Sequence, residues 1–197
     1  IDASDSAVTV LSDQAALTDR SHFSGASLTL APGARLDASG GWYGDGAVTV
    51  ADGATLTLAG APAGPAHYFT QAITLAGDNA SLHLAPGSHS FGDLSSLAVS
   101  RVTLGAPAVT DAPETEYAGT VDAARASMQV HDHARWIITG DSTLRQLQAN
   151  HAQLGFDDDS RTRHAFMTQA LASSATSLAM NPAPAAAIRP AYRLTAD

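Results

Sequence analysis

The stretch AVTVADGATLTL, residues 47–58, decides the fold of this chain. It contains two short runs in which alanine, valine or leucine alternates with threonine, and Ala51, Asp52 and Gly53 form a turn between them. Alternation over so few residues is typical of a short strand with one buried side. A turn this short favours strands on successive faces of one coil.

The same phrase recurs along the first half of the chain, and its equivalent positions Leu28, Val48, Ile73, Val102 and Met128 are about 20 to 29 residues apart. Short strands that repeat with an imperfect period in this range predict a solenoid. We therefore expect an all-β chain that forms a right-handed parallel β-helix, with strands of successive coils about 4.8 Å apart. The further instances of the phrase are residues 7–10, 26–30, 72–75, 80–84 and 101–104.

A β-sandwich of short antiparallel strands is the alternative fold, because sandwiches also carry frequent turn signals. The hairpin dipeptide Asn-Gly is absent from the sequence. The paired phrases at 47–58 and 72–84 are joined by very short turns. These features favour the β-helix.

The composition limits the classes of function. The net charge is −9, which argues against binding of nucleic acid or an anionic membrane, since both need a basic surface. The chain has no lysine, and its only glutamates are Glu114 and Glu116. The absence of cysteine suits a chain that crosses a membrane unfolded. We find no signal peptide and no apolar run of 18 residues, and we expect the chain to be a fragment of a longer protein.

The pattern changes in the second half of the chain. Residues 106–125 break the rhythm and predict a loop that rejoins the solenoid at 117–119. From Ala126 the strand phrases contain larger residues, as expected of coils that cap a solenoid end. We predict a β-helix stem at 1–125, capping coils at 126–180 and a Pro/Ala-rich tail or linker at 181–197. Residues 164–180 fit a helix or two short strands, and we favour strands.

One motif carries a family resemblance. Trp136-x-x-Thr-Gly-Asp-Ser-x-Leu144-x-x-Leu147, followed by Ala152-x-Leu-x-Phe156, resembles the autochaperone or junction region of bacterial autotransporter passenger domains. It is most similar to the group of trypsin-like serine protease and immunoglobulin A protease autotransporters. The specific resemblance covers about residues 117–156, and the looser β-helix pattern covers 1–105. The strand pair that usually follows in this family is not evident here.

The resemblance implies a structural stem of a secreted passenger, whose C-terminal part nucleates folding and aids export across the outer membrane. It also implies a partner, the protein's own C-terminal outer-membrane β-barrel, and a location outside a Gram-negative cell or on its surface after periplasmic transit. The parent would be a virulence-associated secreted protease or adhesin. We expect no cofactor. The predicted folding core comprises Trp136, Ile138, Gly140, Asp141, Ser142, Leu144, Leu147, Leu154 and Phe156.

The triplet Gly140-Asp141-Ser142 has a catalytic alternative, the nucleophile of a trypsin-like protease. That site needs a glycine-rich turn after the serine to shape the oxyanion hole. Here Thr143 and Leu144 follow within a strand pattern. We therefore predict a turn closed by side-chain hydrogen bonds, and no enzyme activity in this segment. A β-helix lyase or hydrolase would need clustered acidic and basic residues, which we do not find.

Three further stretches have a metal-binding alternative. His131-Asp132-His133 with His151 resembles a zinc set without a clear third ligand. The segment 40–46 is faintly like a calcium-binding repeat, and 157–159 is a run of three aspartates. We predict surface turns for all three and no metal site.

An adhesin is the alternative function. In this hypothesis the β-helix flank binds a host glycan or protein. Trp42 and Tyr43, predicted to be exposed in a glycine-rich turn, would provide the contacts together with the loop 106–119.

Overall fold

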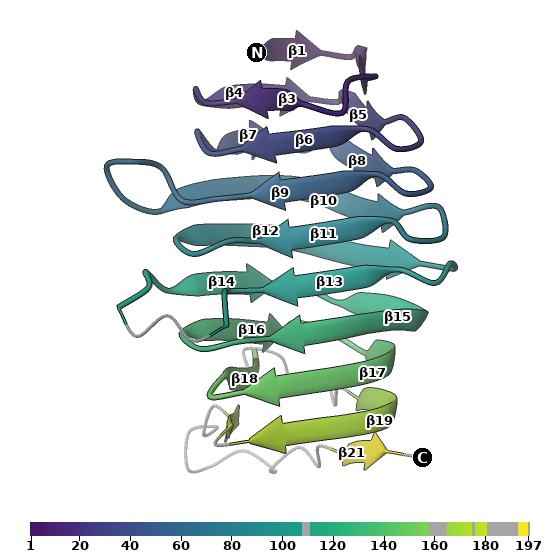
Figure 1. Ribbon diagram of the computed structural model, residues 1–197, viewed down its shortest axis with the longest axis vertical. Helices are drawn as coiled ribbons and strands as arrows, with labels where there is room; N and C mark the ends of the chain where they lie inside the picture. The colour runs from purple at the N-terminus through teal and green to yellow at the C-terminus, as the bar shows by residue number, and fades with distance from the viewer. Residues whose placement is uncertain (108–110, 158–164, 175, 181–192, 197) are drawn as a thin grey trace, which may run out of the picture.

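The structure is a computed structural model that describes residues 1–107, 111–157, 165–174, 176–180 and 193–196. The regular elements in these ranges are all strands. They wind into a parallel β-solenoid of eight coils and the start of a ninth (Figure 1). The front strands run to the left and the rear strands to the right while the chain descends, so the solenoid is right-handed. The predicted fold is confirmed.

Each coil has three strand positions, and equivalent strands of successive coils pair with one another. This pairing forms three parallel sheets, which we name face 1, face 2 and face 3. Face 1 contains β1 (Asp2–Ser4), β4 (Ser21–Ser24), β7 (Trp42–Gly44), the first parts of β10 (Ala66–Leu75) and β12 (Ser88–Ser96), β14 (Thr115–Ala118), β16 (Ala134–Ile138), β18 (Gln153–Phe156) and β20 (Ser177–Met180).

Face 2 contains β2 (Ala7–Val10), β5 (Ser27–Leu30), β8 (Ala47–Val50), the second parts of β10 and β12, the first parts of β15 (Val121–Val130), β17 (Ser142–Asn150) and β19 (Ala165–Ser174), and β21 (Arg193–Ala196). Face 3 contains β3 (Ala15–Leu17), β6 (Arg35–Ala38), β9 (Thr55–Leu58), β11 (Ser81–Leu84), β13 (Arg101–Leu104) and the second parts of β15, β17 and β19.

The pairing between strands is parallel and in register. On face 2, Val8 pairs with Leu28, Leu28 with Val48, and Val48 with Ile73. Each aliphatic side chain therefore stacks on its equivalent in the next coil, and the inward columns form one continuous apolar core. This arrangement excludes the antiparallel sandwich.

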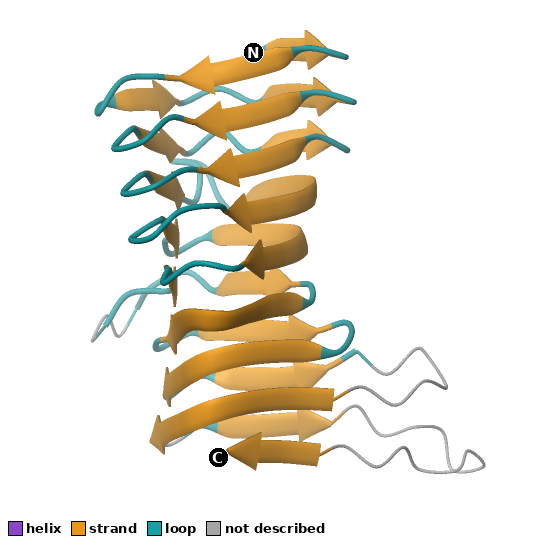
Figure 2. Ribbon diagram, turned by 90° about the vertical axis from the view of Figure 1, so that its right-hand side faces the viewer, coloured by secondary structure: helices purple, strands orange, loops and turns teal. Residues whose placement is uncertain are grey.

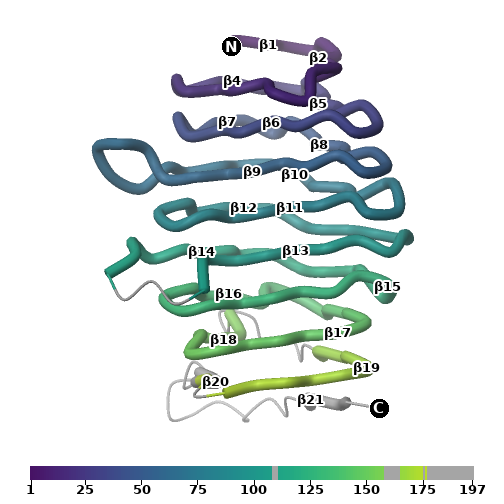
Figure 3. The backbone as a smooth tube through the Cα atoms, viewed as in Figure 1, coloured from purple at the N-terminus to yellow at the C-terminus, as the bar shows by residue number. Residues whose placement is uncertain are grey.

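Tight turns separate faces 2 and 3 in the first coils. Gly33 and Gly53 have positive φ angles of 72° and 63°, which only glycine adopts without cost. Their amides donate to the carbonyl oxygens of Asp52 and Asp78 in the next coil, at 2.9 and 3.0 Å. The turns are therefore stacked and hydrogen-bonded like the strands. One excursion, between β9 and β10, projects from the solenoid (Figure 3).

The sixth coil changes the architecture. The turn between faces 2 and 3 disappears, and β15, β17 and β19 each run across both faces as one bent strand (Figure 2). In the β15–β17 pairing the register shifts between Ala123 and Ser127, where β15 bends. The predicted break at 106–125 is shorter in the structure: β14 begins at Thr115, close to the predicted return at 117–119, and β15 begins at Val121.

The end of the described chain is also built from strands. β19 and β20 confirm strands rather than a helix in residues 165–174 and 177–180. The Pro/Ala-rich segment 181–190 lies outside the described residues. Beyond it, β21 pairs with β19. No helix in the described part of the chain is long and apolar enough to span a membrane.

Candidate functional site

The motif that carries the family resemblance forms the core of the last coils. Trp136 on β16 is fully buried, and its indole Nε1 donates to the carbonyl oxygen of Gly119 at 3.2 Å. Its ring meets Phe166 edge to face, with centroids 5.3 Å apart. Tyr117 lies in the coil above, on β14, and pairs there with Trp136. These three rings, Tyr117, Trp136 and Phe166, are named the C-terminal aromatic cluster.

Tyr117 is held by its hydroxyl group as well as by its ring. The hydroxyl oxygen lies 2.9 Å from the carbonyl oxygen of Gly92 and 3.0 Å from that of Thr120. Complete burial, together with the nearby Asp93 carboxylate, raises the pKa of Tyr117 well above its ordinary value. The hydroxyl is therefore a fixed donor that ties the fifth coil to the sixth.

The apolar members of the predicted folding core all lie inside the solenoid. Leu154 and Phe156 on β18 pair with Trp136 and Ile138 on β16. Leu144 and Leu147 occupy the same inward columns as Ala123 and Met128 of the coil above. All six predicted apolar residues are no more than 5 % exposed.

Gly140, Asp141 and Ser142 form the corner between β16 and β17. The Ser142 hydroxyl is buried, accepts a hydrogen bond from the Val121 amide at 3.0 Å and donates to the Gly140 carbonyl at 3.2 Å. Asp141 Oδ1 accepts the amide of Ala165 at 2.8 Å. A Cβ on Gly140 would lie 2.6 Å from Thr120 Cγ2, so a larger residue here would force that methyl group to move. These contacts make the triplet a corner that joins three coils.

A second aromatic cluster, in the N-terminal coils, was not foreseen from the sequence. Trp42 is 2 % exposed, so the prediction that it is an exposed ligand contact is wrong. Its ring meets Phe23 and Tyr68 edge to face, with centroids 5.8 and 4.9 Å away. Burial raises the pKa of Tyr68 to about 12, and its hydroxyl lies 2.6 Å from the Ala38 carbonyl oxygen. We name Phe23, Trp42 and Tyr68 the N-terminal aromatic cluster.

Strand alternation could have revealed this burial. Trp42 and Tyr43 are consecutive residues of β7, so one points inward and the other outward. Tyr43 is 43 % exposed, as predicted. The glycine-rich segment 40–46 is thus a strand of face 1, and Asp45 Oδ1 accepts the Gly25 amide at 2.6 Å in the coil above.

The histidine-rich stretch lies on a turn rather than on a strand. His133 and His151 both have positive φ angles at the starts of successive face 1 strands. Asp132 pairs with His151, with 3.2 Å between Oδ1 and Nδ1, beside an open depression of about 300 Å³. Burial lowers the pKa of His131. Among the described residues, no three ligating side chains converge on a metal position. Asp158 and Asp159 lie outside the described residues.

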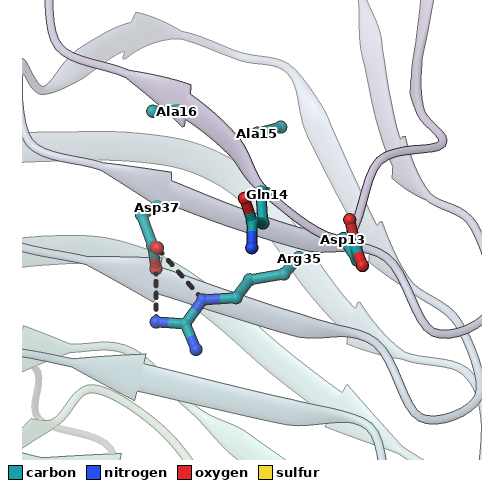
Figure 4. A pocket seen from close by; sticks show the side chains of 6 residues that line it. All are labelled: Asp13, Gln14, Ala15, Ala16, Arg35 and Asp37. Carbon is teal, nitrogen blue, oxygen red and sulfur yellow. Dashed lines mark hydrogen bonds and ion pairs between the residues drawn. The ribbon is translucent and has the colours of Figure 1, made fainter.

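A second depression lies on face 3 near the N-terminus (Figure 4). It has a volume of about 430 Å³ and is lined by the first two coils. The Arg35 guanidinium donates two hydrogen bonds to the Asp37 carboxylate, at 3.0 and 3.2 Å. Burial disfavours the ionised carboxylate, yet the contacts of Arg35 and Thr57 hold the pKa of Asp37 below its ordinary value. The charges of Arg35 and Asp37 neutralise each other, so this surface ion pair does not indicate a catalytic or binding role.

The chain was compared with known proteins. No family model matches it. It is 30 % identical over 167 residues to a protein named serine protease EspC, from Escherichia coli O127:H6 (strain E2348/69 / EPEC). The match covers 76 % of this chain but spans only 13 % of the length of that relative. The similarity is therefore distant and concerns one segment of a much longer protein.

Proposed function

We propose that this chain is a structural stem from the passenger domain of a secreted autotransporter, and that its last coils nucleate the folding of the rest. The observation that carries the proposal is that the residues of the junction-like motif make up the buried core of the C-terminal coils. The parallel β-solenoid and the distant similarity to a named serine protease support it. Both agree with the serine protease group that the motif resembles.

The geometry suggests how folding would spread from this end. A coil presents a full row of backbone donors and acceptors and an apolar column to the next coil. In a solenoid, stability is close to a sum of coil and neighbour terms, so folding propagates from the most stable coils. The C-terminal aromatic cluster and the long strands β15, β17 and β19 would supply that start. Coils that fold outside the cell would also prevent the chain from sliding back.

The remaining parts of the proposal concern the whole protein. The stem would cross the periplasm unfolded, leave through the protein's own C-terminal outer-membrane β-barrel, and stand at the surface of a Gram-negative cell or be secreted. We propose that this segment itself is not catalytic. The burial and two backbone hydrogen bonds of Ser142 support that reading, because a nucleophile must reach its substrate.

Surface display of the complete protein tests the proposal. Trp136→Ala should reduce the protease-resistant passenger at the cell surface several-fold, because large-to-small changes of this kind cost about 3–5 kcal/mol. Trp42→Ala is the matched control, since it removes an equally buried indole from the same face in the N-terminal coils. We expect near-normal export of the control. Unchanged display and unchanged proteolysis of the Trp136 variant would refute the nucleating role.

A further inference from the structure

Two histidines lie side by side on the outer side of face 1. β10 and β12 pair in register, so His67 of the fourth coil is opposite His89 of the fifth. Their chain neighbours Tyr68 and Ser90 are buried, so strand alternation places both imidazoles on the outside of the solenoid. β10 lies above β12 in the stack of coils (Figure 1). We name His67 and His89 the histidine pair.

The ring nitrogens of the histidine pair are not engaged by the fold. Neither imidazole has a hydrogen bond or an ion pair with another described residue, and their recorded contacts are with other rings. By contrast, His22 on the same face contacts the Asp2 carboxylate at 3.0 Å. The side chain of His67 is exposed and that of His89 is half-buried. A small ion can therefore reach the pair from solvent.

The relative position of the two rings suits a shared metal ion. The lone pair of an imidazole nitrogen lies in the plane of its ring. The two planes are inclined by 75°, so they intersect and one ion can lie in both. An ion about 2.0–2.1 Å from each nitrogen lies roughly 3.2 Å from each ring centroid, so two rings bound at a tetrahedral angle have centroids roughly 5.2 Å apart. The centroids of His67 and His89 are 5.1 Å apart.

The charge of the surroundings is compatible with a bound cation. Glu116 occupies the next position of the same column, below His89. Its carboxylate is already paired, because Oε2 lies 3.6 Å from Arg135 Nη1. We therefore assign only the two imidazoles as ligands. The whole chain has a net charge of −9, and a negative chain attracts cations to its surface.

We propose that the histidine pair binds a zinc ion through one nitrogen of each imidazole. Imidazole is a preferred ligand of zinc, and ligands at a right angle, as in a square-planar ion, would bring the centroids to roughly 4.5 Å. Water completes the coordination. Two protein ligands are fewer than structural or catalytic zinc sites have, so the ion is exchangeable. It links the fourth coil to the fifth and is separate from the folding role proposed above.

Titration of the folded chain with Zn²⁺, followed by NMR of the imidazole signals, tests the site. The signals of His67 and His89 should shift together and saturate at one ion for the pair. His67→Ala should weaken zinc binding at His89 by about tenfold or more, because loss of a ligand costs at least as much as loss of a group that supports one. His22→Ala changes another outward histidine of face 1 and is the matched control. It should leave the titration of the pair unchanged.

Circular dichroism on each variant separates loss of binding from loss of folding. Three results would overturn the proposal: no shift of the two signals at millimolar zinc, saturation of the two signals at different zinc concentrations, or unchanged affinity at His89 in a folded His67→Ala variant. The last result would mean that the rings touch but bind independently. None of these results bears on the export assay, so the two proposals fail independently.

Discussion

Trp42 and Tyr68 in the N-terminal coils and Tyr117 and Trp136 in the C-terminal coils lie in the same inward column of face 1, but the two aromatic clusters are supported differently. In the N-terminal coils, Trp42 lies on β7, a strand of three residues, and glycine turns separate the faces. In the C-terminal coils, Trp136 is backed by β15 and β17, strands of ten and nine residues that run across two faces. The number of rings is similar, so we infer that strand continuity makes the C-terminal coils the more stable block.

One residue marks the joint between the two blocks. Ser90 on β12 pairs with Tyr68 above and Tyr117 below, and so separates the two clusters. Its hydroxyl is buried and has no hydrogen-bond partner in the described structure. An unsatisfied buried hydroxyl is unfavourable, so Ser90 is a weak point in the packing between the two clusters.

The largest effects are expected from substitution of the two buried tryptophans, and they distinguish the N-terminal coils from the C-terminal coils directly. Trp136→Ala should lower the free energy of unfolding by about 3–5 kcal/mol and expose all coils to protease. Trp42→Ala should have a similar local cost but open only the coils before Ser90. Limited proteolysis with mass spectrometry of the fragments measures this. If the Trp42 variant is cleaved equally in β15 and β17, the blocks are not distinct.

A smaller loss of stability is expected at the corner formed by Gly140, Asp141 and Ser142. Ser142→Ala leaves the buried Val121 amide without its acceptor and should cost about 1–3 kcal/mol. Thr143→Ala, at the next, outward position, is the control and should change stability little. Chemical denaturation of both variants gives the difference. A neutral Ser142→Ala substitution would contradict the structural role of the triplet.

Alkaline pH tests both clusters through their tyrosines. Unfolded tyrosines ionise near pH 10, whereas burial raises the pKa of Tyr68 to about 12 and raises the pKa of Tyr117 well above its ordinary value. The unfolded chain therefore loses its protons first, so stability is complete below about pH 10 and falls as the pH rises toward 12 and beyond. Denaturation at about pH 8 and about pH 11 should show the loss, and Tyr117→Phe should reduce it. An equal loss in the variant would place the effect elsewhere.

The smallest expected effect has the opposite sign. Ser90→Ala removes the unsatisfied hydroxyl at the joint and should be neutral or stabilising by up to about 1 kcal/mol. Ser96→Ala is the matched control, because Ser96 is buried but donates to the Leu75 carbonyl at 3.1 Å. The control should be destabilising. Thermal denaturation distinguishes the two, and a destabilising Ser90→Ala would show that the joint is well packed.

Faces 2 and 3 could be predicted from the sequence because their strands alternate aliphatic residues with threonine. The phrase at 47–58 became β8 and β9 with the turn between them. Face 1 was missed in the first coils because its strands contain serine, histidine and glycine, as in β4 and β12. Its inward residues are serines and aromatic rings, which carry no aliphatic period. The burial of Trp42 was not predicted because face 1 was missed.

The core of the candidate site was predicted more fully, because Trp136 and Ile138 alternate with outward residues in β16. The partners that hold these residues come from the two neighbouring coils: Gly119 binds the Trp136 indole, Val121 binds Ser142, and Phe166 contacts the Trp136 ring. The coils differ in length. Leu94, Val121 and Ser142 are equivalent positions of three successive coils, yet the first two are 27 residues apart and the last two are 21 apart. Residue spacing alone therefore does not give their register.

Hydrogen exchange of the native chain tests the claim that the C-terminal coils are the stable block most directly. Amides of β15 and β17 should exchange only through global unfolding, while those of β4 to β8 should exchange through a partial opening of lower free energy. Added denaturant should affect the first group strongly and the second weakly. Equal protection throughout, or higher protection in the N-terminal coils, would contradict the account.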